Sequence, residues 1–123
     1  MLDHVGVNVS DFAAARAFYV AALEPLGIKP VMEMEGIACG FGDERMPYFW
    51  IAARPNPTPS AHIAFSASDR ATVDAFHTAA IAAGARDNGE PGPRPIYHEH
   101  YYGAFVLDPD GNNIEAVCHR PEG

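Results

Sequence analysis

The chain has 123 residues, 48% of them apolar and 20% charged, and 16 acidic against eight basic residues give it a formal net charge of −8. These values are typical of one globular domain, which we expect to cover residues 1–123. The acidic balance and the scattered Lys and Arg exclude a basic surface for nucleic acid, and no apolar run approaches the roughly 20 residues that span a bilayer.

The first half of the chain predicts a strand, a helix and three more strands. In residues 4–9 the valines alternate with His4, Gly6 and Asn8, which is typical of a half-buried strand. Ser10-Asp11 then offers a helix cap, and apolar residues at three- and four-residue spacing continue until Gly27. Residues 31–53 predict three short strands, with turns around residues 35–36 and 42–44.

The second half follows the same order. A proline-rich connector, residues 54–59, precedes an alternating strand at 62–67, and a helix runs from the cap at Ser68-Asp69 to Gly84. Residues 86–95 are rich in Pro and Gly, so we expect a loop there. Two strands begin at Tyr101 and Asn113, joined by the tight turn 108–111.

These two halves share a sequence repeat. Residues 4–23 and 62–81 align at a constant offset of 58 residues, with eight of 20 positions identical and a histidine at the start of each copy. One structural unit used twice explains this register. We therefore predict module one at 1–53, a linker at 54–60 and module two at 61–120, with His4 and His62 in equivalent places.

The repeated histidines and one glutamate form a candidate metal site. In each first strand the histidine lies opposite the apolar row that the helix must cover, so it faces away from that helix. Glu115 lies inside the apolar strand NIEAV, and a carboxylate there needs a partner. His4, His62 and Glu115 together match a two-histidine, one-carboxylate site for Fe, Mn, Zn, Ni or Co. Taken singly, each is more often a hydrogen-bonded or solvated residue.

Two further residues are candidates for acid–base chemistry. Tyr101 shares a strand face with Gly103 and Phe105, and His100 precedes it. Either side chain is placed to reach the cavity as a general acid or base or as a hydrogen-bond donor. The alternative, an aromatic and partly exposed strand entrance, stays open. Cys39 and Cys118 lack an adjacent base and are expected to be free buried thiols, which, with the lack of a secretory leader after Met1, favours a cytoplasmic protein.

The segments DHVGVNVSDFAAARAFY, AHIAFSASD and FVLDPDGNNIEAV resemble the vicinal oxygen chelate superfamily, which includes glyoxalase I, extradiol dioxygenases, fosfomycin-resistance transferases and bleomycin-resistance proteins. The resemblance covers essentially the whole chain. It implies an α+β fold of two βαβββ modules that form an incomplete barrel around a central cavity. It also implies one divalent metal ion, held by His4, His62 and Glu115, that binds vicinal oxygens of a small substrate.

The chain departs from individual members of the superfamily. Glyoxalase I carries a fourth ligand on the last strand of its first module, where this chain has Tyr48-Phe49-Trp50-Ile51. Extradiol enzymes usually place a tyrosine ten residues before the glutamate, where Phe105 stands. The basic residues with which fosfomycin enzymes hold a phosphonate are few here. The resemblance therefore implies three ligands and leaves the activity open.

The sequence predicts a small cytoplasmic metalloenzyme of the glyoxalase-like lyase or extradiol dioxygenase type, with a small-molecule substrate and neither nucleic acid nor membrane as partner. The alternative is a non-catalytic binding protein of the bleomycin-resistance type, which sequesters a ligand. Members of this superfamily often form dimers, sometimes with exchanged modules, so we expect a homodimer. The ligands then come from one chain or from two.

Overall fold

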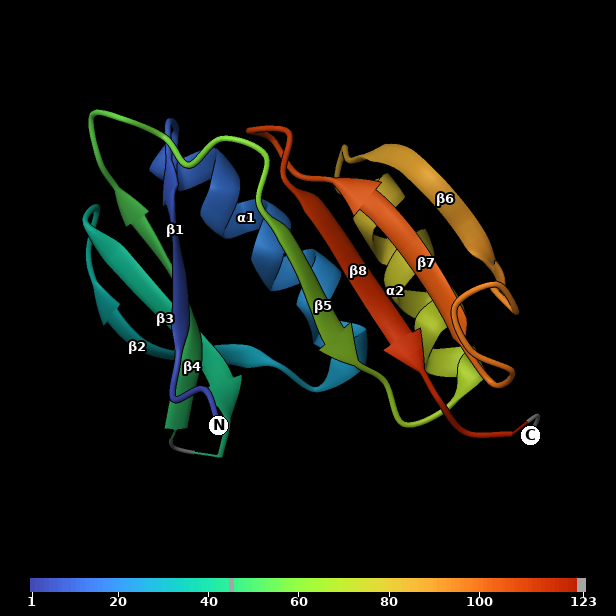
Figure 1. The fold of residues 1–123 in the computed structure, drawn as a ribbon. Coiled ribbons are helices and arrows are strands. Elements are labelled where there is room, and N and C mark those ends of the chain that lie inside the picture. Colours follow the sequence, from blue (N-terminus) through green and yellow to red (C-terminus); the bar gives the residue numbers. More distant parts are fainter. Residues whose placement is uncertain (45, 122–123) are drawn as a thin grey trace.

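The structure is a computed structural model that describes residues 1–44 and 46–121. Each half of the chain forms a strand, a helix and three further strands (Figure 1). The first half comprises β1 (Val5–Val9), α1 (Phe12–Leu23), the 3-10 turn η1 (Glu24–Leu26), β2 (Lys29–Met34), β3 (Ala38–Asp43) and β4 (Met46–Ala53). The second half comprises β5 (His62–Ser66), α2 (Arg70–Ala82), β6 (Arg86–Pro93), β7 (Tyr102–Leu107) and β8 (Asn113–Cys118).

The two sheets have the same topology. Their strand orders are β1-β4-β3-β2 and β5-β8-β7-β6, and in each sheet the first strand of the module pairs in parallel with the last. The predicted α+β fold of two βαβββ modules is confirmed. The sheets remain separate across the described residues, with β1 and β5 as their inner edge strands, and they do not close into a hydrogen-bonded barrel.

Both helices begin at the aspartates that the repeat places in register. The carboxylate of Asp11 accepts a hydrogen bond from the backbone N–H of Ala14 at 3.1 Å, and Asp69 accepts one from Thr72 at 2.8 Å. These bonds satisfy N–H groups that have no partner within the helix. The first helical segment ends at Gly27, whose φ of 77° is the left-handed conformation that glycine adopts readily.

The predicted loop at residues 86–95 is wrong, because residues Arg86–Pro93 form strand β6. This strand pairs with β7 in an antiparallel register that shifts twice, on either side of Gly89. It is the outer strand of its sheet, where prolines and glycines are tolerated because one edge of the backbone needs no partner. Pairing with β7 therefore outweighs the turn-like local composition.

One hydrophobic core joins the two modules. The rings of Phe49 in β4 and Phe65 in β5 lie 5.3 Å apart, and Tyr19 of α1 packs edge-on against Phe49 at 5.0 Å. All three side chains are buried and belong to the same cluster as Phe76 of α2. The helix side of each sheet is thus the packed side, and the opposite side, here called the open face, is turned away from the helices.

A buried carboxylate ties module one to the β7–β8 turn. The hydroxyl of Tyr19 in α1 donates to Oδ2 of Asp108 at 2.5 Å, and that carboxylate also accepts from the backbone N–H of Asp110 and from Asn112. The side chain of Asn112 in turn accepts from the N–H of Ala61 at 2.8 Å. The DPDGNN motif is therefore a hydrogen-bonded link from α1 to the residue that precedes His62.

Candidate metal centre on the open face

Strands β5 and β8 bring two of the three predicted ligands together. Ala64 of β5 is opposite Glu115 of β8, so His62 and Glu115 share the open face of the second sheet. Nε2 of His62 lies 2.8 Å from Oε1 of Glu115. The carboxylate is only 1% exposed, whereas the imidazole is about half exposed, at 54%. A buried carboxylate is thus paired with an imidazole that solvent or a ligand can reach.

Tyr101 holds the other oxygen of that carboxylate. Its hydroxyl donates to Oε2 of Glu115, and its ring lies over Gly103, where an added Cβ would be 3.1 Å from Cε1 of the tyrosine. Burial, and then the hydrogen bond to Glu115, raise the pKa of Tyr101 well above the ordinary tyrosine value. The hydroxyl therefore remains protonated near neutral pH and acts as a donor to Glu115.

The other predicted site residues lie apart from this pair. His4 has an exposed side chain, and its Nδ1 is 2.8 Å from a carboxylate oxygen of Asp3. Nε2 of His100 lies 3.8 Å from a carboxylate oxygen of Glu99, and the backbone N–H of His100 donates to Nδ1 of His98. Within residues 1–44 and 46–121 of a single chain, no three His, Cys, Asp or Glu side chains are arranged to hold one metal ion.

Module one has a tryptophan at the position that corresponds to Glu115. The repeat aligns Gly6 with Ala64, and Gly6 is opposite Trp50 just as Ala64 is opposite Glu115. The indole covers Gly40, where an added Cβ would lie 2.8 Å from the ring. Met32, the next residue across the sheet, is 52% exposed. The open face of module one is therefore an apolar wall where the second module carries its carboxylate.

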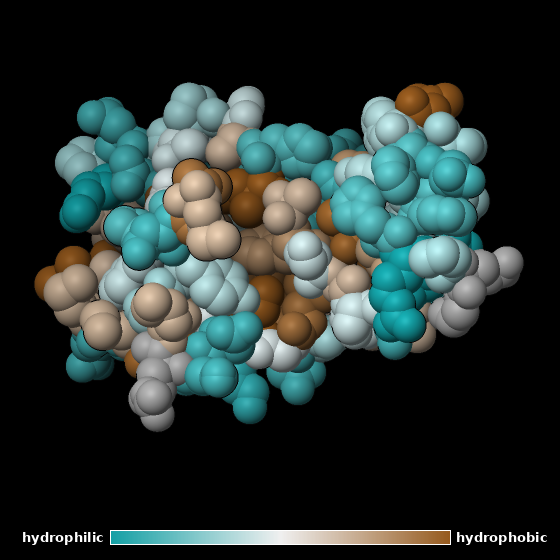
Figure 2. Space-filling view, turned by 60° about the horizontal axis from the view of Figure 1, so that its bottom comes forward, coloured by the Kyte–Doolittle hydropathy of each residue, from teal (hydrophilic) through white to brown (hydrophobic). Residues whose placement is uncertain are grey.

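A groove separates the inner edges of the two sheets. Its volume is about 920 Å³, with Leu26, Phe49 and Phe65 among its apolar lining and both His4 and His62 contributing to it. Figure 2, which brings the lower end of Figure 1 forward, shows an apolar hollow in the middle of this side of the molecule. An apolar cavity with a few polar groups is the usual form of a small-molecule site.

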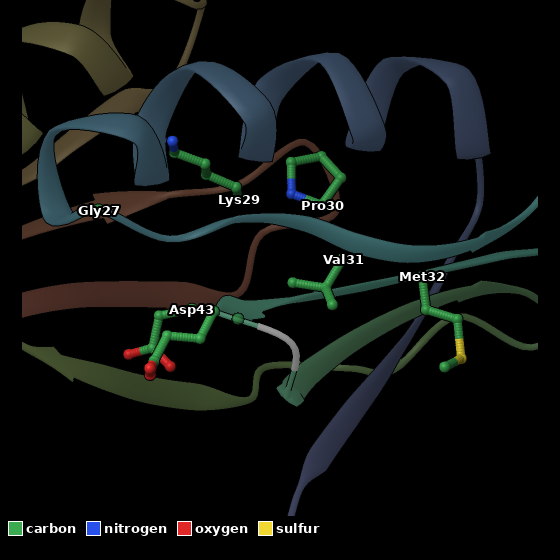
Figure 3. A pocket seen from close by; sticks show the side chains of 8 residues that line it. Gly27, Lys29, Pro30, Val31, Met32 and Asp43 are labelled. Carbon is green, nitrogen blue, oxygen red and sulfur yellow. The ribbon is translucent and has the colours of Figure 1, made fainter.

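A second hollow, of about 540 Å³, lies at the outer edge of module one (Figure 3). Lys29, Asp43 and Glu44 contribute its charged groups, and Val31 and Met32 contribute apolar surface. None of the predicted site residues lines it. Asp43 also lines the groove, but neither His62 nor Glu115 lines this second hollow.

The structure adds two site residues that the sequence analysis did not assign. Phe105, opposite Glu115 in β7, packs against the ring of His62 with centroids 6.2 Å apart. The ring of His119 lies 5.2 Å from that of Tyr101. Strand parity was the available signal for both, because residues two or four apart in a strand share a face. Phe105 lies four residues after Tyr101, and His119 lies four residues after Glu115.

Comparison with known proteins identifies the family. Residues 1–116 match the profile of the Glyoxalase/Bleomycin resistance protein/Dioxygenase superfamily, and the chain belongs to that superfamily. A glyoxalase/bleomycin resistance protein from Albidiferax ferrireducens T118 is 34% identical, with 96% of this chain and 98% of that chain covered and a TM-score of 0.81. A search of curated proteins finds no match.

Two more distant structures share the fold. A glyoxalase/bleomycin resistance protein/dioxygenase family enzyme from Burkholderia phytofirmans PsJN is 22% identical, covers 96% of this chain and 98% of its own, and has a TM-score of 0.73. Lactoylglutathione lyase from Agrobacterium tumefaciens is 23% identical, covers 96% and 92%, and has a TM-score of 0.67. In the described part of this chain, no helix is both long and apolar enough to cross a membrane.

Proposed function

We propose that the chain is a metal-dependent enzyme of the glyoxalase/dioxygenase type that acts on a small substrate with vicinal oxygens. The observation that supports this most strongly is the buried carboxylate of Glu115, which is hydrogen-bonded to His62 and Tyr101 on an open sheet face. A carboxylate buried this deeply is costly without a cation or strong donors. A divalent ion between Glu115 and the half-exposed imidazole is the partner that this donor set favours.

The donors present in one chain fit a metal ion in part. His62 and Glu115 supply one imidazole and one carboxylate, and His4, the second imidazole, belongs to the other module. We propose that a homodimer completes the site, with His4 of one copy beside His62 and Glu115 of another. The ion, when bound, supplies Lewis-acid polarisation of two substrate oxygens. Fe, Mn, Zn, Ni and Co all suit such ligands.

Within this site the protein side chains have distinct tasks. Tyr101 fixes one oxygen of Glu115 and thereby directs the other toward His62. The exposed side of His62 and the ring of Phe105 border the space that a substrate would occupy. His100 directly precedes Tyr101 in the chain, and we propose both side chains as proton donors or acceptors that a bound substrate brings into contact.

Metal analysis tests the proposal. Protein purified after loading with Fe(II), Ni(II), Zn(II) or Mn(II) is expected to retain one ion per site, measured by elemental analysis. Glu115→Gln and His62→Gln should lose that ion. His77→Gln is the matched control. His77 of α2 pairs with Asp87 of β6 and is not a proposed ligand, so this variant should bind metal as the parent does. Full metal content in Glu115→Gln would refute the site.

The assembly and the activity need separate measurements. Sedimentation should give a dimer for the parent protein, and His4→Gln should lose metal while it remains a dimer. Catechols and the adduct of glutathione with methylglyoxal are the first substrates to offer to each metal-loaded form, because they separate dioxygenase from lyase chemistry. We further propose a cytoplasmic location, in which Cys39 and Cys118 remain free thiols.

A specific observation also favours a non-catalytic binding protein of the bleomycin-resistance type. Trp50 and the exposed Met32 make the open face of module one apolar, and aromatic and methionine side chains suit the sequestration of an apolar ligand. This alternative predicts protein without bound metal that still binds a large aromatic compound and quenches the fluorescence of Trp50. Stoichiometric metal in the purified protein would contradict it.

A further inference from the structure

Arg94, in the segment between β6 and β7, is fixed on the open face beside the candidate metal centre. Its guanidinium carbon lies 5.4 Å from the centre of the Phe105 ring, and the ring of His62 packs against the same phenyl group at 6.2 Å. Phe105 is opposite Glu115 in the sheet. A positive charge and the His62–Glu115 pair therefore flank a single aromatic ring.

The guanidinium is held in place by backbone atoms. Nη1 donates to the carbonyl oxygens of Gly92 at 2.9 Å and Pro93 at 3.4 Å, and Nη2 donates to that of Glu90 at 2.8 Å. Glycines leave the room for it: an added Cβ would be 3.3 Å from Nη2 at Gly89 and 3.2 Å from Nη1 at Gly92. A flexible cation is thus preorganised, which lowers the entropic cost of binding an anion.

No carboxylate within residues 1–44 and 46–121 neutralises this cation. Among the described residues none of the ion pairs within 4.0 Å involves Arg94, although the chain has twice as many acidic as basic residues. Among the residues that the structure describes, these three carbonyl contacts are the hydrogen bonds of the guanidinium, and they leave Nε–H and one Nη2–H available. These two atoms form one edge of the planar group, which is suited to bidentate binding of a carboxylate.

We propose that Arg94 binds a carboxylate group of the ligand, so that the site takes small organic acids. The inference rests on the proposed function, in which the open face of the second sheet binds the substrate. The inference adds the chemical class of the ligand. Its carboxylate would bind Arg94 on one side of the Phe105 ring, and its reacting atoms would lie beside His62 and Glu115 on the other side. The net negative charge of the chain repels anions in general, so a carboxylate is held only where a local cation such as Arg94 offsets that repulsion.

A pair of probes that differ only in charge tests this inference. Benzoate and benzamide have the same ring, but only benzoate offers a carboxylate. Titration of the full-length protein with benzoate, followed by NMR, should shift the Nε–H signal of Arg94 and the amide signals of Gly89 and Gly92. Benzamide should shift them at least tenfold less at equal concentration, because a neutral amide loses the charge-assisted pair.

Variants of two arginines supply the controls. Arg94→Gln should abolish the preference for benzoate, and Arg94→Lys should restore part of it, because lysine keeps the charge but not the fork. Arg86→Gln removes the same charge from the start of β6 and should leave the preference intact. Equal shifts with both probes, no shift with benzoate, or a preference that survives Arg94→Gln would each overturn the inference.

The probe experiment is independent of metal. It is run on metal-free protein, so a failure of metal binding refutes the proposed function and leaves the result for Arg94 readable. Conversely, Arg94→Gln should retain as much metal as the parent, since its side chain is not a proposed ligand. Loss of metal in this variant would show that Arg94 only organises the loop, which would also overturn the inference.

Discussion

Removal of one hydroxyl should weaken the link between the two modules. Tyr19 is fully buried, and in Tyr19→Phe the ring keeps its packing against Phe18 and Phe49 while the hydrogen bond to Asp108 is lost. A hydrogen bond to a charged group contributes about 1.5–3 kcal/mol. Because Asp108 keeps its donors from the 110–112 turn, we expect about 1.5–2 kcal/mol of the free energy of unfolding to be lost.

Urea denaturation measures this loss. With a slope near 1.5 kcal/mol per molar urea, the midpoint should fall by about 1 M at unchanged slope. Tyr97→Phe is the control, because Tyr97 is 61% exposed and its substitution should change the free energy by less than about 0.5 kcal/mol. A loss in Tyr19→Phe as small as that of the control would refute the reasoning. A changed slope would mean that the variant alters the unfolded ensemble instead.

Three further predictions concern pH, reactivity and packing. The hydrogen bonds from Thr72 lower the pKa of Asp69, so the ionised Asp69 carboxylate stabilises the fold above about pH 4, and this stabilisation is lost as pH falls through the folded pKa. Asp69→Asn cannot titrate and should therefore flatten the plot of urea midpoint against pH in this range. An unchanged plot would contradict the prediction. Burial raises the pKa of Cys39 to about 11, so iodoacetamide at pH 8 should alkylate it only after unfolding, as mass spectrometry would show. Gly40→Ala places a Cβ 2.8 Å from the ring of Trp50 and should cost about 1–3 kcal/mol with a shift in tryptophan fluorescence; a variant as stable as the parent would rule out the close contact.

Several features of the site could be predicted from sequence because they depend on local periodicity. Alternation placed His62 away from the apolar row of β5, and parity placed Tyr101 on one strand face with Gly103 and Phe105; the register of β7 with β8 shows that Glu115 lies on that same face. The structure brings these three side chains into contact on one open face. The identity of the family also lay in local motifs, above all the turn DPDGNN and the glutamate that follows it.

Contacts between residues far apart in the sequence could not be predicted from these local patterns. The role of Asp108 as a link to Tyr19 depends on a contact across 89 positions, and the position of Arg94 over Phe105 depends on a strand that local composition predicted as a loop. Strand β6 exists because β7 offers an edge to pair with. No property of residues 86–93 alone supplies that partner.

The sequence by itself determined the repeated strand–helix–strands order, the caps at Asp11 and Asp69, and the faces on which the histidines lie, because short-range sterics and the burial of apolar residues fix all three. Only the tertiary structure decided which polar groups meet. In one chain it joins His62 to Glu115 and leaves His4 on the other module, because the shared core packs the modules through their helices and turns the open faces outward.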